Sequence, residues 1–168
     1  DSARDVEVAD IDGDGDFDIV SASYNDDTIA WYENDGAANP TFTAADIATT
    51  ADGALGVTIA DIDGDGDLDI ISASAEDDTI AWYENDGASN PSFTAVDIAT
   101  TADSAHDVEV ADMDGDGDLD IISGSANDHT IAWYENDGAA NPTFTAADIA
   151  TSADGAYELF IGDLDGDG

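Results

Sequence analysis

A nine-residue acidic stretch constrains the fold of this chain more than any other feature. It begins at Asp10 as Asp-Ile-Asp-Gly-Asp-Gly-Asp-Phe-Asp, and similar stretches begin at Asp61, Asp112 and Asp163. Each start lies 51 residues after the previous one (61 − 10, 112 − 61 and 163 − 112). A fixed period of this length indicates a repeat architecture, in which one structural unit packs against its own copies. The predicted domains are repeats at 1–51, 52–102 and 103–153, followed by the truncated start of a fourth at 154–168.

The chemistry of the stretch indicates a metal-binding loop. Five carboxylates within nine residues repel one another strongly unless a cation lies between them. Gly13 and Gly15 allow the positive φ angles that wrap such a loop around a point. Because the ligands are hard oxygens, the cations that fit are Ca²⁺ and Mg²⁺. We favour Ca²⁺, which accepts about 6–8 oxygens in flexible geometry.

We assign backbone-carbonyl ligation in the first loop to Asp16. The side-chain ligands that we assign there are Asp10, Asp12, Asp14 and Asp18. A solvated acidic turn without metal is the alternative, and the recurrence of the loop at identical spacing argues against it. The loop is not an EF-hand, because position 12 is Ser21 rather than the bidentate Glu of that motif. The candidate ligands of the complete loops are Asp10, Asp12, Asp14, Asp16 and Asp18; Asp61, Asp63, Asp65, Asp67 and Asp69; and Asp112, Asp114, Asp116, Asp118 and Asp120.

The composition of the chain, above all its charge, limits the classes of molecule that it can bind. The formal net charge of the 168 residues is −41, with one Arg and no Lys, which excludes nucleic acid and anionic membranes as partners. Hydrophobic residues make up 42%, so the chain is not a disordered acidic tail. We expect an extracellular or cell-surface location, because weak calcium sites fill mainly outside the cell. The chain begins at Asp1 and ends within an acidic loop, so we also expect it to be a segment of a longer protein.

The rest of each repeat reads as strands and turns. In the first repeat we expect strands at Val6–Ala9, Phe17–Ser23, Thr28–Glu33 and Phe42–Ala48. The third is apolar on both faces, as expected for a sheet packed between two like sheets. No segment sustains a helical period. The predicted fold is all-β, with propeller blades of four antiparallel strands: three blades and the first strand of a fourth.

The acidic loop, followed by Thr-Ile-Ala-Trp-Tyr-Glu-Asn-Asp-Gly at 28–36, resembles the FG-GAP/VCBS repeats of integrin α-chain-type β-propellers. The resemblance covers essentially the whole chain. It implies that each loop joins the first two strands of a blade, and that its aspartates occupy the family's ligand positions. Asp163, Asp165 and Asp167 match the start of a fourth site. Because a closed propeller has roughly 4–8 blades, the remaining blades lie outside these residues, or several chains complete a ring, or the repeats form an open array. We favour the first.

Positions that differ between the copies suggest a ligand face. They fall before the first strand and between the second and third, two connections that emerge opposite the calcium loops in a propeller. By resemblance to integrin-like propellers, that face binds ligands. Free drift of exposed loop residues is the simpler interpretation. The candidate residues are Arg4, Tyr24, Asp27, Leu55, His106, His129 and Tyr157.

The sequence favours a non-enzymatic function. Cys and Lys are absent, so the common nucleophilic arrangements cannot be assembled, and the two His lie at non-equivalent positions of the third repeat. We expect a calcium-binding extracellular scaffold for adhesion or a surface filament, whose partners are a protein, a glycan or its own copies. A lectin-like glycan-binding propeller is the alternative. The propeller of a polysaccharide lyase is less favoured, because a single Arg suits acidic sugars poorly. We expect the three Trp residues to pack between blades rather than stack on sugars.

Overall fold

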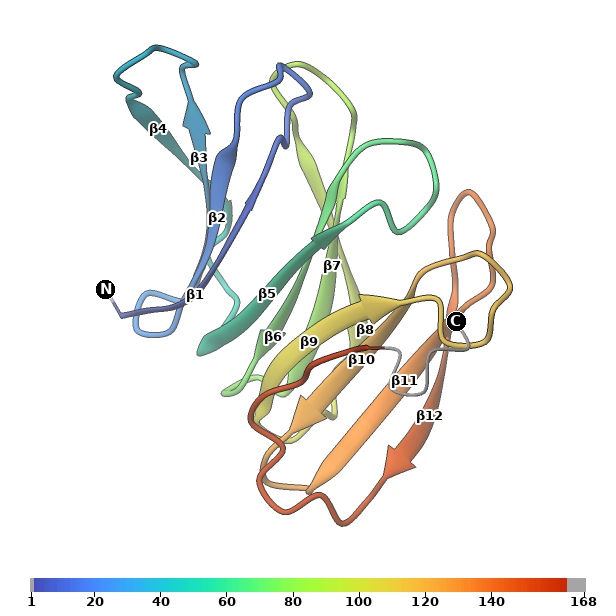
Figure 1. The fold of residues 1–168 in the computed structure, drawn as a ribbon. Coiled ribbons are helices and arrows are strands. Elements are labelled where there is room, and N and C mark those ends of the chain that lie inside the picture. The colour runs from blue at the N-terminus through green and yellow to red at the C-terminus, as the bar shows by residue number, and fades with distance from the viewer. Residues whose placement is uncertain (1, 163–168) are drawn as a thin grey trace.

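All regular secondary structure in the computed structural model, which describes residues 2–162, is β-strand (Figure 1). The strands form three four-stranded antiparallel sheets, and each sheet follows chain order. The first contains β1 (Ala3–Ala9), β2 (Asp18–Ser23), β3 (Thr28–Asn34) and β4 (Phe42–Ala48). The second contains β5 (Ala54–Ala60), β6 (Asp69–Ser74), β7 (Thr79–Asn85) and β8 (Phe93–Ala99). The third contains β9 (Ala105–Ala111), β10 (Asp120–Ser125), β11 (Thr130–Asn136) and β12 (Phe144–Ala150).

The observed sheets confirm the predicted all-β class and the four-stranded unit. Each sheet lies within one 51-residue repeat, as expected for propeller blades. The boundaries differ by a few residues at most. The first strand starts earlier than expected, at Ala3, because Ala3 and Asp5 still pair with β2 around a bulge. Phe17 belongs to the acidic loop rather than to β2, and its side chain is exposed.

The sheets pack face to face through alternating side chains. Successive residues of a strand point to opposite faces, so each sheet can bury one face against the previous sheet and the other against the next. Ile29 and Trp31 of the first sheet lie in one buried cluster with Ile70 and Tyr83 of the second. The corresponding residues of the second and third sheets form a second cluster, which includes Ile80, Trp82, Ile121 and Tyr134. One apolar pattern thus builds both interfaces.

The tryptophans confirm this packing for two of the three repeats. Trp31 is 4% exposed and Trp82 is 1% exposed. The ring of Trp82 meets the ring of Phe144 edge to face, with 6.3 Å between centroids, which adds to the energy of burial. Trp133 occupies the same strand position on the outer face of the third sheet and is only partly buried.

The structure assigns no strand to residues 156–162, where the sequence predicts the first strand of a fourth blade. The segment nevertheless lies beside β9 as β5 lies beside β1. The N–H of Leu159 donates to Asp107 Oδ2 at 2.6 Å, and the N–H of Val57 donates to Asp5 Oδ2 at 3.0 Å. A ladder requires a neighbour equivalent to β6, and the described residues contain none for this segment.

The chain order of each sheet gathers the acidic loops at one end of the strands. The loop between β1 and β2 and the turn between β3 and β4 lie at that end (Figure 1). The β2–β3 turn and the connection to the next sheet lie at the other end. In the described part of the chain there is no helix that could cross a membrane.

Candidate metal centre

The first acidic loop spans the gap between β1 and β2 and folds around its own carboxylates. Gly13 and Gly15 have φ angles of +71° and +98°, which residues with a side chain rarely adopt. The N–H of Gly15 donates to Asp10 Oδ2 at 3.0 Å. The N–H of Asp14 donates to Asp12 Oδ1 at 3.3 Å. These short-range bonds turn the loop inward and bring its carboxylates together.

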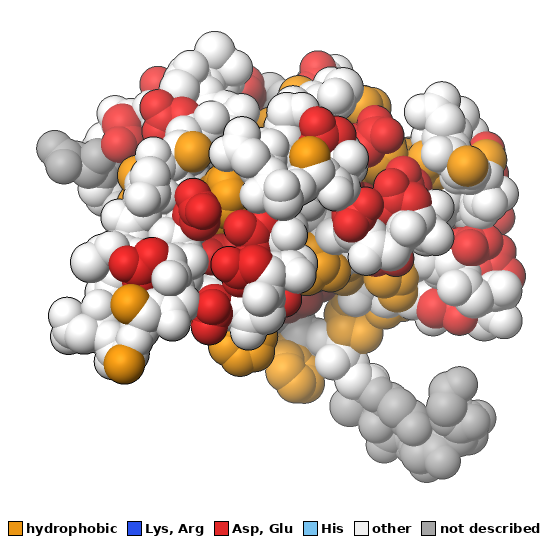
Figure 2. Space-filling model, turned by 90° about the horizontal axis from the view of Figure 1, so that it is seen from above, with side chains coloured by type: hydrophobic (Ala, Val, Ile, Leu, Met, Phe, Trp, Pro, Cys, Tyr) orange, Lys and Arg blue, Asp and Glu red, His pale blue; other side chains and the backbone are white. Residues whose placement is uncertain are grey.

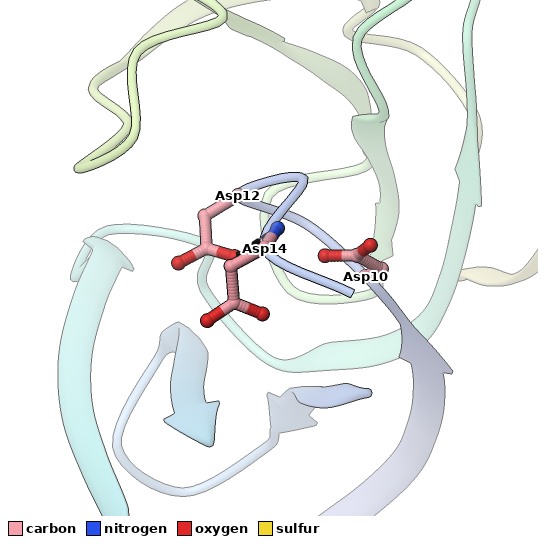
Figure 3. A group of neighbouring side chains, drawn as sticks. All are labelled: Asp10, Asp12 and Asp14. Carbon is pink, nitrogen blue, oxygen red and sulfur yellow. Dashed lines mark hydrogen bonds between the residues drawn. The ribbon is translucent and has the colours of Figure 1, made fainter. Parts of the chain in front are cut away.

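Three of the predicted ligands converge in every complete loop. One carboxylate oxygen from each of Asp10, Asp12 and Asp14 lies within 4.8 Å of the others. Figure 3 shows the three carboxylates gathered at the loop, with Asp10 entering from the end of β1. The same grouping occurs at Asp61, Asp63 and Asp65 and at Asp112, Asp114 and Asp116. Such groups of oxygens suit a hard divalent cation.

Two buried carboxylate oxygens without hydrogen-bond partners indicate whether the loops fit a metal ion. Oδ1 of Asp10 and Oδ1 of Asp61 are shielded from solvent and accept no hydrogen bond from the described residues. A buried acceptor without a partner is costly and calls for an explanation. Each atom belongs to a carboxylate of a convergent group, so an ion held by that group would satisfy it. The first two loops therefore fit a divalent cation.

The aspartate at loop position 9 has a different environment. Asp69 is buried, and its two oxygens accept hydrogen bonds from the N–H groups of Asn85 (2.8 Å) and Ile62 (3.2 Å). Asp18 and Asp120 make the equivalent pairs of bonds. These residues fasten the loop to the end of the third strand. Because a carboxylate oxygen can accept more than one contact, metal ligation by them stays a prediction.

The aspartate at loop position 7 faces the turn between the third and fourth strands of its own sheet. A Cβ added at Gly87 would lie 2.0 Å from Asp67 Oδ2, and Gly36 and Gly138 stand in the same relation to Asp16 and Asp118. Only glycine leaves room for this contact. The predicted backbone-carbonyl ligation at this position stays a prediction.

The third loop is arranged differently from the first two. Asp112 is exposed, and its Oδ1 accepts hydrogen bonds from the N–H groups of Gly115 (2.7 Å) and Asp116 (3.1 Å). Its Oδ2 accepts a third from Gly117 at 3.1 Å. Both oxygens are occupied by the loop's own backbone, whereas one oxygen of Asp10 is free for an ion.

Electrostatics also favour a cation in the loops. Desolvation, and to a lesser extent the neighbouring carboxylates, raise the pKa values of Asp12 and Asp63. Burial raises the pKa of Asp69 to about 6, although the N–H groups that bond to it oppose the shift. Figure 2 shows acidic side chains spread over one face of the molecule, with few other charges among them. A bound cation would relieve this repulsion.

A family model, described as the FG-GAP-like repeat, matches residues 10–72, 61–123 and 112–168. The chain belongs to the FG-GAP-like repeat family. Each match runs from one acidic loop into the next, so the family pattern includes the convergent aspartates. No curated protein matches the chain. Membership confirms the resemblance predicted from the loop and from the Trp-Tyr-Glu-Asn-Asp-Gly segment.

The predicted ligand face is partly assembled in this FG-GAP-like chain. Arg4, Leu55, His106 and Tyr157 line one cavity of about 410 Å³ along the inner strands β1, β5 and β9. The rings of His106 and Tyr157 meet edge to face, with 4.9 Å between centroids.

The remaining candidates of this face lie apart from the cavity. The guanidinium of Arg4 lies 5.2 Å from the centroid of the Tyr24 ring, and Tyr24 hydrogen-bonds to Glu76. Asp27 Oδ1 accepts the N–H of Gly53. His129 lies 3.5 Å from the carboxylate of Asp154. Asp163, Asp165 and Asp167, the incomplete fourth site, lie outside the described residues.

Sequence reasoning missed the asparagine that ends each third strand. In the sequence each of these residues, Asn34, Asn85 and Asn136, opens an Asn-Asp-Gly segment, which is typical of a turn. The structure shows that their side chains also bond to the acidic loops. Their constant distance from each acidic loop was a visible signal, but it does not reveal the partner of the side chain.

Proposed function

We propose that this FG-GAP-like chain is a non-catalytic, calcium-stabilised scaffold that works in adhesion or in a surface filament outside the cell. The buried, unpartnered oxygens of Asp10 and Asp61 carry this proposal, because they stand within carboxylate groups that recur in each repeat. Calcium bound by Asp10, Asp12 and Asp14 would offset part of the negative charge of the loop and fix the hairpin between β1 and β2.

The donor set favours calcium over other cations. The convergent atoms are carboxylate oxygens, which suit Ca²⁺ and Mg²⁺ rather than soft metals. The loops are short and oxygen-rich, which suits the flexible coordination geometry of Ca²⁺, whereas Mg²⁺ demands a strict octahedron and keeps its waters. Calcium is abundant outside the cell, and this supports the extracellular location that we propose.

A scaffold function is supported by the chemistry that the chain carries. It has no Cys or Lys, one Arg and two His, and His106 and His129 have separate partners in the structure. The convergent carboxylates face one another rather than an apolar pocket of the kind that raises the pKa of a general acid. Bound calcium therefore serves stability, with the sheets presenting surfaces to a partner.

The cavity between the inner strands favours a second candidate, a lectin-like module. It combines His106, Tyr157 and Arg4 with several carboxylates, a mixture that can stack on and hydrogen-bond to a sugar. A glycan array with the intact chain and with His106→Ala tests this candidate. Binding that is lost in the variant supports the glycan ligand, and an array without signal removes it.

Isothermal titration with calcium tests the principal proposal. We expect saturable binding in the intact chain and a loss of about one ion per chain in the double variant Asp61→Asn and Asp63→Asn. The matched control is Asp46→Asn with Asp97→Asn, which removes the same charge from the outer strands β4 and β8. Equal stoichiometry in all three proteins would contradict the proposal.

A further inference from the structure

Asn85, the last residue of β7, hydrogen-bonds to two different acidic loops. Its side-chain Nδ2 donates to the carbonyl of Leu68 at 3.0 Å, within its own repeat. The same Nδ2 donates to the carbonyl of Ile11 at 3.2 Å, in the preceding repeat. An amide NH₂ has two donors, and here each of them serves a separate loop.

The surroundings of Asn85 hold it firmly in this position. Its side chain is 2% exposed. Its Oδ1 accepts the N–H of Gly87 at 3.0 Å, and its backbone N–H donates to Asp69 Oδ1 at 2.8 Å. These bonds use both N–H donors of the side-chain amide, its Oδ1 and the backbone N–H. Rotation of the side chain would break the bonds to the Ile11 carbonyl, which is buried, and to the Leu68 carbonyl, which is partly buried. The bridge is therefore a fixed element rather than a surface contact.

The two carbonyls lie at informative places in the loops. Ile11 stands between Asp10 and Asp12, two members of the first convergent group, and its buried side chain is clamped between the sheets. Leu68 precedes Asp69 in the second loop. The amide of Asn85 thus bonds to one carbonyl in each loop. An ion that orders one of the loops would act on the other loop through this amide.

The bridge recurs once more, and one copy lacks it. Asn136 donates to the carbonyls of Ile62 (2.9 Å) and Leu119 (3.0 Å), and so joins the second and third loops. Within residues 2–162, the side-chain Nδ2 of Asn34 donates only inside its own repeat, to the carbonyl of Phe17 at 2.9 Å. Asn34 is therefore a natural control for the bond inside a repeat.

We propose that Asn85 and Asn136 are positioning residues that couple calcium binding in neighbouring loops. The inference rests on the proposed calcium function. The amide of Asn85 holds the Leu68 carbonyl in the second loop and the Ile11 carbonyl in the first, so order that an ion would impose on the second loop would pass through Asn85 to the backbone between Asp10 and Asp12. By linkage, calcium in the first loop strengthens the second by the same factor.

The test follows each loop separately by nuclear magnetic resonance during a calcium titration. The amides of Gly13, Gly64 and Gly115 report the first, second and third loops. Binding in the second loop is abolished with Asp63→Asn and Asp65→Asn. In the otherwise unchanged chain we expect this to weaken calcium binding in the first loop about two- to tenfold, the effect of one buried hydrogen bond.

A double-mutant cycle isolates the asparagine. With Asn85→Ala, loss of the second loop should leave the affinity of the first loop unchanged. With Asn34→Ala, the two- to tenfold coupling should persist, because the Asn34 side chain makes no bond to another repeat in the part of the chain that the structure describes. Asn136→Ala should abolish the coupling of the second and third loops and preserve that of the first and second. If Asn85→Ala fails to fold, Asn85→Ser, which keeps one donor, should still reduce the coupling.

Two results would overturn the inference, and they differ. Independent binding in the unchanged chain, or coupling of equal size in Asn85→Ala, refutes the bridge and leaves the calcium function standing. Absence of calcium-dependent shifts at Gly13, Gly64 and Gly115 refutes the calcium function and the bridge with it.

Discussion

Aspartates of one acidic loop serve two physical purposes. One carboxylate oxygen of Asp61 and one of Asp63 lie within 4.8 Å of each other. Oδ1 of Asp61 has no hydrogen-bond partner among the described residues. Asp69 is buried and bonded to two backbone N–H groups. On the proposed calcium function, aspartates of the first kind are stabilised by a bound cation, whereas those of the second kind contribute hydrogen bonds to the fold without any metal.

Replacement of these two kinds of aspartate should have opposite metal dependence. Without calcium, Asp69→Ala should lower the free energy of unfolding by about 2–5 kcal/mol, because it leaves two buried N–H groups unpaired. Asp63→Ala should be nearly neutral or stabilising in chelator, since it removes repulsion, but should reduce the stabilisation by calcium. Urea unfolding with and without calcium measures both. Equal losses for the two variants in chelator would contradict this division.

The stability of the metal-free protein should rise as the pH falls from 6 towards 4. The pKa of Asp69 is about 6 in the folded chain and its ordinary value is 3.8, so the folded state binds more protons between these values. Burial raises the pKa values of Glu7, Asp107 and Glu109 as well, and these shifts have the same sign.

Bound calcium should oppose this pH dependence, because protons compete with the ion for carboxylates. The stabilisation by calcium should therefore shrink over the same range. Urea unfolding at pH 7 and pH 5, with and without calcium, provides the four values. A metal-free protein that is less stable at pH 5 than at pH 7 would be inconsistent with the raised pKa values.

At the scale of the strands, most of the architecture could be predicted from the sequence. The two-sided apolar pattern of Ile29, Trp31 and Tyr32 anticipated sheets packed on both faces, and the acidic loop anticipated the hairpin between β1 and β2. The bridge from Asn85 to Ile11 could not be predicted, because it joins residues 74 positions apart in the sequence and depends on how two sheets pack against each other. The state of residues 156–162 also depended on a neighbouring strand rather than on their apolar sequence.

Burial between sheets, rather than residue type, should set the contribution of each tryptophan. Trp82→Ala removes a fully buried ring and its contact with Phe144, and should cost about 3–5 kcal/mol. Trp133→Ala is the matched control at the equivalent position, where the ring is only partly buried, and should cost much less. Urea unfolding in calcium compares the two. Equal losses would mean that packing between sheets does not distinguish these sites.

The whole molecule presents two outer faces that resemble its internal interfaces. Val6 is 56% exposed and Phe42 is 45% exposed on the first sheet, whereas the equivalent Val57 of the second sheet is buried. With Ile19 and Tyr32 they line an apolar cavity of about 340 Å³. Trp133 lies on the opposite outer face, at the position from which Trp82 contacts the next sheet. Apolar faces of this kind mark sites of association.

The isolated 168-residue chain should therefore self-associate as its concentration rises. We expect Phe42→Asp and Trp133→Asp each to reduce association, because each removes one of two complementary faces, while an equimolar mixture forms a dimer through the faces that remain. Sedimentation velocity over a wide concentration range measures this. Val96→Asp, a change at an exposed residue of β8, is the control. A chain that is monomeric throughout would exclude the prediction.

The central claim concerns the molecule as a whole: calcium stabilises a fold whose net charge of −41 opposes compaction. Binding that requires assembled loops adds its free energy to folding, about 2.7 kcal/mol per site at a hundredfold excess over the dissociation constant. Thermal unfolding at constant ionic strength, in millimolar calcium and in excess chelator, measures this most directly. We predict a markedly higher melting temperature in calcium. Identical melting temperatures in calcium and in chelator would contradict the account.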